Sequence, residues 1–427
     1  MKKIWIVNHY GEPPTVGKYT RHYKFALKLI ARGYDVKIFA ASAIHRTNTN
    51  YTCNERDFLE KEINGVPFVF VKTCNYMGNG QKRIKNMIQY ATRILRVAKN
   101  FEEPNVIYSS SPHPLTWLSG YILSKRYNAK FIAETRDLWP ETLVAMGRIK
   151  RNSIPAKILY SLEKFIYKRA DKLIFTFPGG KDYVRSRGLD VSKVRYINNG
   201  VDIDEFNDNK LNCTFEDEDL NDNNTFKILF TGAIGKANAI YRIVDIAKIF
   251  IDKGIKNIRF YIFGDGPERQ YLENYIIENK ITNVVFKGKV DKKYIPNILS
   301  KSNLNIFCLE YLPNLFKYGL SPNKMFEYFA SGKPIISNVE CGYDMLKKYN
   351  CGITVNGGSA EALAEGILKF YNMPKEEYDT YCANALKAAK DFDYKILTDK
   401  LEKVILETQA EGDEDFADTF NKPQKTV

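Results

Sequence analysis

Short apolar runs alternate with longer amphipathic stretches along most of the chain, and this alternation predicts strands that alternate with helices. In the first half, runs typical of buried strands cover residues 3–8, 35–40, 66–71, 105–109, 129–134 and 172–177. A second series covers residues 227–231, 257–263, 283–287, 304–308, 334–337 and 352–355. Such a pattern is typical of α/β domains with parallel sheets.

A stretch rich in Asp, Asn and Glu at residues 203–226 interrupts the alternation and is typical of a linker. A chain of 427 residues is also too long for one ordinary core. The predicted organisation is a first domain over 1–195, a linker over 196–226, a second domain over 227–390, a helix over 391–408 that is a candidate to cross back to the first domain, and a disordered acidic and polar tail over 409–427. We expect two Rossmann-like domains whose parallel sheets face each other across a cleft, with ligands at the carboxyl ends of the strands.

The net positive charge of the chain arises from its first half. Residues 1–190 hold 33 Lys and Arg against 15 Asp and Glu, a net charge of +18, whereas the remaining residues hold 31 against 35, a net charge of −4. This asymmetry indicates an anionic partner for the first half, either an anionic membrane surface or nucleic acid.

Residues 82–99 combine an apolar stripe with a basic flank. The stripe recurs at helical spacing and consists of Ile84, Met87, Ile88, Ala91, Ile94, Leu95 and Ala98. The flank consists of Lys82, Arg83, Lys85, Arg93, Arg96 and Lys99, with no acidic residue between them. A basic amphipathic helix can lie in an anionic lipid interface, so we predict that these cations face a membrane. The alternative is a surface helix that packs its stripe on its own sheet.

The cysteines and the first residues indicate a cytoplasmic protein. The seven cysteines form no CxxC pair, which favours a reducing compartment and argues against a metal cluster. The opening Met-Lys-Lys-Ile-Trp-Ile-Val has too few apolar residues for a signal peptide and is typical of a first strand. No apolar run approaches the length of a membrane span.

The segment from Gly319 to Ile336 carries the clearest sign of a ligand site. A loop with Pro322 precedes a predicted helix, and we expect Glu327 in the first turn of that helix. Backbone N–H groups at a helix N-terminus bind phosphate oxygens. A carboxylate further along the helix can accept hydrogen bonds from ribose hydroxyls. The two features together predict a nucleotide, and an ordinary capped helix is the alternative.

Three further turns carry glycine or asparagine, two of them at predicted strand ends and one beside the predicted linker. Gly264-Asp265-Gly266-Pro267-Glu268 follows strand 257–263, and Thr231-Gly232-Ala233-Ile234-Gly235 ends the first strand of the second domain. Glycine lets a diphosphate approach the backbone closely, although a tight strand-to-helix turn explains the same residues. Asn198-Asn199-Gly200-Val201-Asp202 is typical of a hinge loop.

Charged residues follow strand 129–134 in the first half. Arg136, Asp137 and Glu141 come after its end, where α/β domains bind their ligands. Arg136 can pair with a phosphate or orient a carboxylate, and Asp137 and Glu141 are candidates for a general base. A surface ion pair is the alternative for each of them. Asp-x-Asp triplets such as Asp202-Ile-Asp204 arise by chance among 50 acidic residues, so we assign no metal site.

In combination and order, these motifs resemble those of retaining glycosyltransferases of family 4, and most of all the bacterial branch that builds O-antigen, capsule or other surface polysaccharides. The resemblance spans residues 1–405 and rests on Gly17, Arg136 to Glu141, Asn199 to Asp202, Gly264 to Pro267, and Ser321 to Lys324 with Glu327. It implies the two-domain GT-B fold and transfer of a sugar from a nucleotide-sugar donor, a UDP-sugar, to a lipid-linked glycan acceptor. The family needs neither a metal nor another cofactor.

The resemblance also assigns roles to residues. Glu327 matches the second glutamate of the family's E-x7-E motif, which binds the ribose, and the acceptor would approach near Gly17, Arg136 and Asp137. The predicted catalytic residues are Arg136, Asp137 and Glu141. The predicted donor-binding residues are Gly17, Gly232, Ala233, Asn238, Gly264, Asp265, Gly266, Leu320, Ser321, Pro322, Asn323, Lys324 and Glu327.

Three positions depart from the family's pattern. The first glutamate of the E-x7-E motif would fall at Gly319. The Arg and Lys that often neutralise the diphosphate are replaced by Ala233 and Asn238, so Lys236, Arg242 or Lys324 is left to supply that charge. Arg136 stands where many relatives have a histidine.

The expected enzyme is a retaining hexosyl or N-acetylhexosaminyl transferase that is peripheral on the inner face of the cytoplasmic membrane. A sugar-nucleotide epimerase of the same fold is the enzymatic alternative, and it would form product without an acceptor. A nucleic-acid-binding protein is an alternative of another class, but the basic half lacks a recognition motif and we expect no nucleic-acid partner. A membrane scaffold would bind vesicles and no donor.

Overall fold

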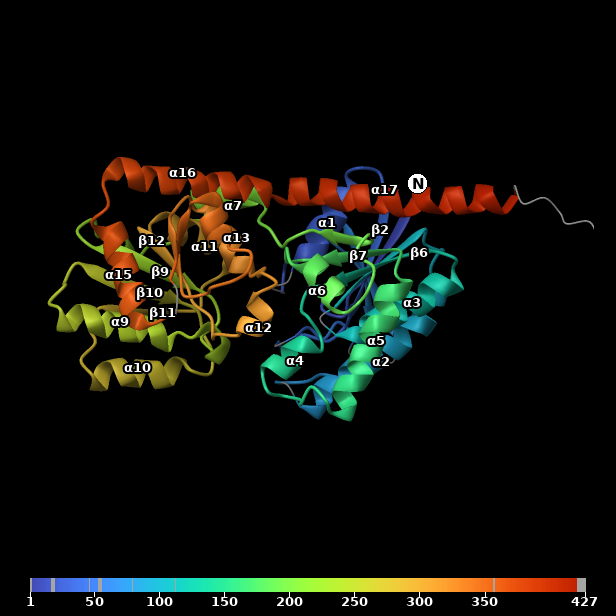
Figure 1. Ribbon diagram of the computed structural model, residues 1–427, viewed down its shortest axis with the longest axis horizontal. Helices are drawn as coiled ribbons and strands as arrows, with labels where there is room; N and C mark the ends of the chain where they lie inside the picture. Colours follow the sequence, from blue (N-terminus) through green and yellow to red (C-terminus); the bar gives the residue numbers. More distant parts are fainter. Residues whose placement is uncertain are drawn as a thin grey trace, which may run out of the picture. The chain divides into compact units, whose positions relative to one another are not determined.

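The computed structural model describes residues 2–16, 20–45, 47–52, 56–78, 80–111, 113–355 and 358–420, with side chains up to Gln409. The chain forms two compact units (Figure 1). Unit 1 consists of Met1–Asn198 and Leu397–Val427, and unit 2 of Asn199–Ile396. We expected a domain boundary at residue 195 and a last helix that crosses back to the first domain. The first segment of unit 1 ends at Asn198, and its second segment begins at Leu397.

Unit 1 is built on an eight-stranded sheet in the order β3-β4-β2-β1-β5-β6-β7-β8. Its strands are β1 (Lys3–Val7), β2 (Asp35–Ala41), β3 (Phe58–Ile63), β4 (Val66–Val71), β5 (Val106–Ser110), β6 (Lys130–Thr135), β7 (Lys172–Phe175) and β8 (Val194–Tyr196). All neighbouring strands are parallel except β3, which pairs with β4 in antiparallel register. The sheet therefore has one carboxyl edge at which the loops after β1, β5 and β6 gather.

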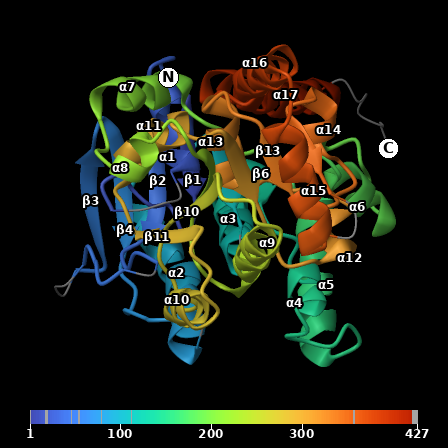
Figure 2. The same cartoon turned by 90° about the vertical axis from the view of Figure 1, so that its left-hand side faces the viewer.

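Helices cover the sheet of unit 1. They are α1 (Arg21–Ile30), α2 (Gln81–Val97), the 3-10 turn η1 (Ala98–Asn100), α3 (Pro114–Arg126), α4 (Glu141–Ala145), α5 (Ile154–Arg169), α6 (Gly180–Ser186) and α17 (Tyr394–Phe420). The helices α2, α3 and α5 pack side by side, as both views show (Figures 1 and 2). Because each of them connects parallel strands, each begins at the carboxyl edge of the sheet.

The last helix, α17, belongs to unit 1 from Leu397 onward. Arg32 donates to Asp399 and Glu402, and Arg195 donates to Glu407 at 2.9 Å. The buried side chains of this helix from Leu397 onward are Leu397, Thr398, Leu401, Val404, Ile405 and Thr408. The helix therefore contributes to the fold of unit 1 through both an apolar face and ion pairs.

Unit 2 is built on a six-stranded parallel sheet in the order β11-β10-β9-β12-β13-β14. Its strands are β9 (Phe226–Thr231), β10 (Ile258–Phe263), β11 (Val284–Gly288), β12 (Leu304–Phe307), β13 (Ile335–Ser337) and β14 (Gly352–Thr354). Its helices are α7 (Ile203–Asn212), α8 (Glu218–Asn221), η2 (Lys236–Asn238), α9 (Tyr241–Asp252), α10 (Arg269–Glu278), η3 (Lys292–Tyr294), α11 (Ile295–Ser300), α12 (Pro313–Phe316), α13 (Asn323–Ala330), α14 (Met345–Tyr349), α15 (Ala360–Tyr371) and α16 (Lys375–Asp391).

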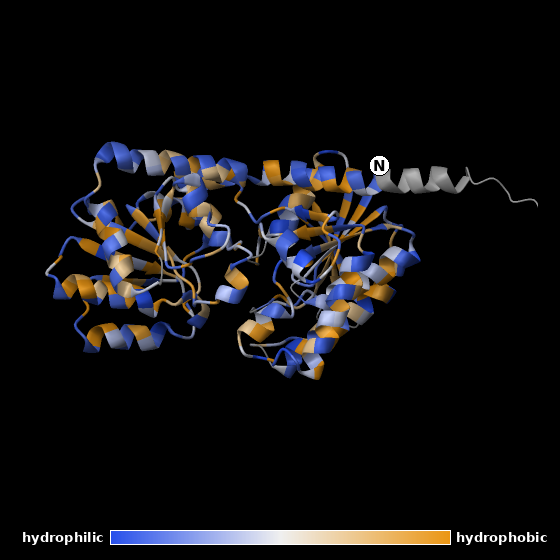
Figure 3. Ribbon diagram, viewed as in Figure 1, coloured by the Kyte–Doolittle hydropathy of each residue, from blue (hydrophilic) through white to orange (hydrophobic). Residues whose placement is uncertain are grey.

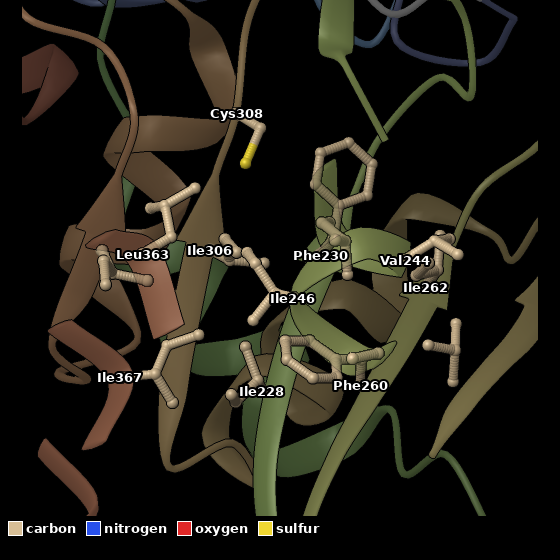
Figure 4. Packing of buried hydrophobic residues seen from close by; sticks show 14 of the residues in the cluster. Ile228, Phe230, Val244, Ile246, Phe260, Ile262, Ile306, Cys308, Leu363 and Ile367 are labelled. Atoms are coloured by element: carbon tan, nitrogen blue, oxygen red, sulfur yellow. The ribbon is translucent and has the colours of Figure 1, made fainter. Parts of the chain in front are cut away.

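Two hydrophobic cores lie on opposite faces of this sheet, because successive strand residues point to opposite sides. Ile336 belongs to the core under α9 and α15, together with Ile228, Phe260 and Ile306 (Figure 4). Ile335, the preceding residue, belongs to the core with α13 and α16. Burial on both faces explains why these strands are nearly continuous apolar runs in the sequence.

The predicted linker is folded, which corrects the expectation for residues 196–226. Asp202 caps α7 by accepting from Glu205 N, and Asp217 caps α8 by accepting from Leu220 N. Phe206 and Leu220 are buried in unit 2. Several of the acidic residues that suggested a loop are helix caps or first-turn residues, positions at which acidic side chains are favoured.

The twelve predicted strands are all present, with shifts of at most a few residues at their ends. Two edge strands, β3 and β8, were missed. The predicted tail 409–427 is wrong at its start, because α17 continues to Phe420, while residues 421–427 lie outside the described residues. Residues that favour helices, such as Glu and Ala, extend past the predicted end.

Candidate functional site

Lys324 is the centre of the candidate donor site in unit 2. It lies in the first turn of α13, and its ammonium reaches the turn after β9, where Nζ donates to Asn238 Oδ1 at 2.9 Å. Nζ also lies 4.1 Å from the centroid of the Phe230 ring. Burial lowers the pKa of Lys324 to about 7, whereas Cys308 and Glu327 raise it. Lys324 is half-buried. With a pKa of about 7, its ammonium loses the proton readily near neutral pH, and a bound anion would favour the protonated form.

Gly232 makes room for this ammonium. Its φ is +148°, and a Cβ at this position would lie 2.8 Å from Lys324 Nζ. Asn238 is held in place because its Nδ2 donates to Ala233 O at 2.8 Å. Four predicted donor-site residues, Gly232, Ala233, Asn238 and Lys324, are thus brought together at the end of β9.

The glycines of the turn after β10, Gly264 and Gly266, are required by close backbone packing. A Cβ at Gly264, where φ is +153°, would lie 1.7 Å from Gly232 O, and a Cβ at Gly266 would lie 2.1 Å from Ile234 O. The turn after β10 therefore packs its backbone directly on the turn after β9, which only glycine permits. Asp265 is exposed and accepts from Gly266 N at 2.8 Å.

The loop before α13 is anchored within unit 2. Ser321 Oγ accepts from Asn199 N at 3.0 Å, and Ser321 O accepts from Asn199 Nδ2 at 2.7 Å. Leu320, Pro322 and Asn323 are half-buried, and Pro322 occupies the N-cap position without a side-chain cap on the helix. The N-terminus of α13, which is the positive end of the helix dipole, therefore has no side-chain cap, and Lys324 lies in its first turn.

Glu327 lies in the second turn of α13, not in the first turn as predicted. Its carboxylate is partly exposed, and Lys292 Nζ approaches it to 3.6 Å. The Glu327 carboxylate therefore remains accessible on the same helix as Lys324, one turn further from the N-terminus.

Gly319 explains the departure from the E-x7-E pattern. Its φ is +89°, a left-handed conformation that glycine adopts freely and glutamate does not. Arg242 donates to Gly358 O, and Lys236 is exposed within the turn itself. Of the three candidate cations, Lys324 is the one whose Nζ donates to Asn238 Oδ1.

In unit 1, the carboxyl edge of the sheet holds a buried ionic cluster that sequence reasoning missed. Glu134, on β6, accepts from Arg21 Nε at 2.8 Å through Oε1 and from Ser110 Oγ at 2.6 Å through Oε2, and His22 Nε2 lies 2.8 Å from Oε2. Burial opposes ionisation of Glu134, but Arg21 and His22 hold its pKa well below the ordinary value. The sequence signal that could have revealed this cluster is the charged residue Glu134 within the otherwise apolar predicted strand 129–134.

Arg21 also fixes the end of unit 1, because its guanidinium donates to Ile197 O at 2.8 Å and to Asn198 O. Beside this cluster, His9 Nε2 lies 2.5 Å from Asn86 Oδ1, and burial lowers the pKa of His9 to about 3. His113 is also buried, and its ring centroid lies 4.8 Å from that of His9. These groups position the edge of the sheet.

The predicted catalytic residues follow this cluster. Arg136 is half-buried and its backbone N donates to Ser111 Oγ at 3.0 Å, and Asp137 is exposed. Glu141 begins α4 and accepts two hydrogen bonds from Arg151, at 3.0 and 2.6 Å. Glu141 is thus engaged by a neighbouring loop, while Asp137 reaches solvent. Gly17 lies outside the described residues.

The predicted membrane-facing cations divide into two groups. Lys82, Lys85, Arg96 and Lys99 are exposed on α2 and η1. Arg83 and Arg93 differ from the prediction, because both bond within unit 1. Arg83 Nε donates to Tyr10 OH and Arg93 donates to Lys72 O, both at 2.9 Å. The buried face of α2 is Asn86, Met87, Tyr90, Ile94 and Val97, so it is rotated from the predicted stripe and leaves Ile84 and Ile88 exposed. No helix in the described part of the chain combines the length and the apolar composition of a transmembrane span.

Two protein-family models match the chain. Residues 20–205 match Glycosyltransferase Family 4, and residues 225–373 match Glycosyl transferases group 1. The probable glycosyltransferase WbjE of Pseudomonas aeruginosa is 22% identical over 247 residues, which are 57% of this chain and 59% of that protein. The match therefore spans less than two thirds of that relative's length.

Solved structures of similar fold cover nearly the whole chain. Anabaena Alr3699/HepE, solved in complex with UDP-glucose, has a TM-score of 0.66 at 14% identity and covers 95% of this chain and 100% of its own. WaaG, a glycosyltransferase involved in lipopolysaccharide biosynthesis, has a TM-score of 0.63 at 13% identity and covers 95% and 99%. At these identities the likeness shows the fold, which is the GT-B fold of two α/β domains.

Proposed function

We propose that this protein, two segments of which match glycosyltransferase family models, transfers a sugar from a UDP-sugar to a lipid-linked glycan acceptor with retention of anomeric configuration. The transfer belongs to the synthesis of a cell-surface polysaccharide and takes place at the inner face of the cytoplasmic membrane. Support for the donor class comes from Alr3699/HepE, which binds UDP-glucose, and support for the polysaccharide from WaaG, which acts in lipopolysaccharide biosynthesis.

The observation that carries the donor site is the position of the Lys324 ammonium at the uncapped N-terminus of α13. Negative charge accumulates on the leaving diphosphate in the transition state, and a fixed cation with helix N–H groups stabilises that charge. Gly232 makes room for the Lys324 ammonium at the turn after β9. Glu327, one turn further along α13, is placed to accept from the ribose hydroxyls. This arrangement neutralises the diphosphate without a metal ion.

The acceptor side is proposed for unit 1. Arg136 and Asp137 follow β6 at the carboxyl edge, and Asp137 is the exposed carboxylate of the predicted set. The acceptor hydroxyl attacks the anomeric carbon from the face that the diphosphate leaves, and its proton passes to a diphosphate oxygen. Asp137 and Arg136 orient the acceptor, and exclusion of water protects the activated sugar from hydrolysis.

The first test is thermal stabilisation of the protein by UDP, GDP, ADP and their common sugar conjugates. A ligand at about 100 times its Kd raises the free energy of unfolding by about 2.7 kcal/mol, which is a shift of several degrees. A shift with uridine nucleotides alone is expected. Transfer is then measured with the identified donor and a polyprenyl-diphosphate-linked sugar, and the anomeric configuration of the product is read by NMR.

Two outcomes would contradict the proposal. The absence of any shift in a protein shown to be folded would remove the donor site. A sugar nucleotide converted to its epimer without any acceptor would favour the epimerase over the transferase.

A further inference from the structure

The connection between α4 and α5 carries exposed hydrophobic residues that the donor and acceptor sites do not use. Ile154 is 75% exposed, Ile158 is 61% exposed and Met146 is 49% exposed. Ile154 and Ile158 lie four residues apart in the first turns of α5, so they share one face of that helix. Single exposed apolar residues are ordinary on protein surfaces, but a cluster in one short segment marks an interaction site.

The same segment is strongly basic. Arg148, Lys150, Arg151 and Lys157 lie among these apolar residues, and no acidic residue occurs between Glu141 and Glu163. Arg151 is neutralised by Glu141, whereas Arg148, Lys150 and Lys157 are exposed. Hydrophobic and strongly hydrophilic residues alternate along this end of unit 1 (Figure 3). Exposed isoleucines between cations match the interfacial region of an anionic bilayer, in which acyl chains lie beneath negative headgroups.

The exposed isoleucines are held in place by the local structure. Ser153 caps α5 by accepting from Ala156 N, and Ala156 is fully buried between Ile154 and Ile158. Arg151 binds Glu141 through two hydrogen bonds and lies over the Tyr160 ring at 5.7 Å. A fixed, outward-facing apolar pair loses little conformational entropy when it enters a lipid surface.

A second exposed apolar group lies at the same end of unit 1. Because α2 and α5 both begin at the carboxyl edge of the sheet, the first turns of α2 point the same way as those of α5 (Figures 1 and 2). Met77, Ile84 and Ile88 are 71%, 56% and 49% exposed there. Lys82 and Lys85 stand beside them and are exposed.

We propose that unit 1 docks on an anionic bilayer through two contacts, of which the α4–α5 connection with Met146, Ile154 and Ile158 is the main one and the first turns of α2 are the other. This inference rests on the peripheral membrane association of the proposed function and assigns the residues that make it. The bilayer then meets the end of unit 1 that also carries Arg136 and Asp137, so a lipid-linked acceptor enters from the membrane without leaving it.

Co-sedimentation of the full-length protein with lipid vesicles tests the assignment. The vesicles are either pure phosphatidylcholine, which is zwitterionic, or phosphatidylcholine with about 30 mol% phosphatidylglycerol, which makes the surface anionic. We compare wild type, I154S/I158S, I84S/I88S and a control, L211S/I277S, whose residues are 76% and 74% exposed in unit 2. The thermal shift produced by UDP is measured on each variant.

Wild type and L211S/I277S are expected to bind anionic vesicles alike and zwitterionic vesicles weakly. I154S/I158S is expected to bind anionic vesicles on the order of tenfold more weakly, because two apolar side chains no longer enter the lipid. I84S/I88S is expected to lose less. The UDP shift stays unchanged in all four proteins, which separates this test from that of the donor site.

Three results would overturn the proposal. The first is that wild type does not bind anionic vesicles, and the second is that I154S/I158S binds them as well as L211S/I277S does. Self-association of wild type that I154S/I158S abolishes, with no vesicle binding, would assign the apolar pair to a second copy of the chain instead.

Discussion

Lys324 and Asn238 meet across 86 residues of sequence, and the hydrogen bond between Nζ and Oδ1 is 2.9 Å long. Through this bond the first turn of α13 supplies a cation to the turn after β9, a place where the family pattern puts an arginine and a lysine and this chain has Ala233 and Asn238. The charge has therefore moved to another element while its position at the turn is retained.

Donor affinity is expected to fall as the pH rises above about 7. Burial lowers the pKa of Lys324 to about 7 in the free protein, and only the protonated amine pairs with a diphosphate. Binding therefore takes up a proton above pH 7, and the affinity for UDP declines by up to about tenfold per pH unit until the bound-state pKa is reached. Calorimetry of UDP binding from pH 6 to 9 measures this slope.

Lys324→Arg provides the control, because a guanidinium stays charged throughout this range. The variant is expected to bind UDP with little pH dependence, whatever its absolute affinity. Lys324→Met is expected to lose about 1.5–3 kcal/mol of binding free energy at pH 6, the size of a hydrogen bond to a charged group. An unchanged slope in Lys324→Arg would assign the titration to another residue.

Glu327→Ala is expected to lose about 1–3 kcal/mol of affinity for UDP, because the ribose hydroxyls lose their acceptor. Binding of inorganic pyrophosphate, which has no ribose, should be unaffected, and competition calorimetry compares the two ligands. Lys292→Ala serves as a matched control, since its ion pair with Glu327 is 3.6 Å long and Lys292 is mostly exposed. Equal losses for UDP and pyrophosphate in Glu327→Ala would place Glu327 at the diphosphate.

Restoring the family glutamate is expected to harm the protein. Gly319→Glu places a side chain at a φ of +89° and should lower the free energy of unfolding by about 1–2 kcal/mol. Gly319→Asn should lose less, because asparagine tolerates the left-handed region. Urea unfolding measures both. A Gly319→Glu protein as stable as wild type, with tighter donor binding, would contradict the backbone explanation.

Arg21→Ala is expected to destabilise the protein by about 3–5 kcal/mol, because it leaves the Glu134 carboxylate buried without its cation. The exposed pair Arg185–Asp182 is the matched control, and Arg185→Ala should change stability by less than about 1 kcal/mol. The folded pKa of Glu134 lies below its unfolded value, so its stabilisation is present above about pH 4 and is lost as the pH falls further. Urea unfolding at pH 7 and pH 3 tests both statements, and equal losses in the two alanine variants would contradict the burial argument.

The role of Glu141 can be separated from that of Arg151. If Glu141 serves chiefly to hold the loop before α5, then Glu141→Gln and Arg151→Ala should each reduce transfer only modestly, because glutamine keeps one of the two acceptor oxygens and Arg151→Ala removes both donors. A general base would behave differently, since Glu141→Gln alone would cost on the order of 100-fold or more in kcat. Steady-state kinetics of the two variants decide between these roles.

The sequence predicted the elements whose signal is local. The strands of both sheets are continuous apolar runs because residues such as Ile335 and Ile336 are buried on opposite faces. The short edge strands β3 and β8 lack such runs, since β3 carries exposed residues such as Glu60 and Glu62. Asp202 and Asp217 were interpreted as loop residues because a helix cap and a turn use the same side chains.

Long-range relationships were beyond sequence reasoning. Nothing in the spacing of Lys324 and Asn238 indicates that they touch, although both were candidates for the same site. The pairing of Arg21 with Glu134 joins an α-helix to a strand more than a hundred residues away. Arg83 and Arg93 were assigned to the outer face of α2 because the buried face includes Asn86, a polar residue that the apolar pattern could not select.

The return of α17 to unit 1 has a consequence for the order in which the protein is made. Leu397, Leu401 and Ile405 complete the core of a unit whose eight strands all precede unit 2 in the chain. Domains usually fold in the order of their synthesis. Here unit 1 cannot add α17 to its core until all of unit 2 has been translated. Unit 1 therefore precedes unit 2 in synthesis but completes its fold after unit 2 has been made.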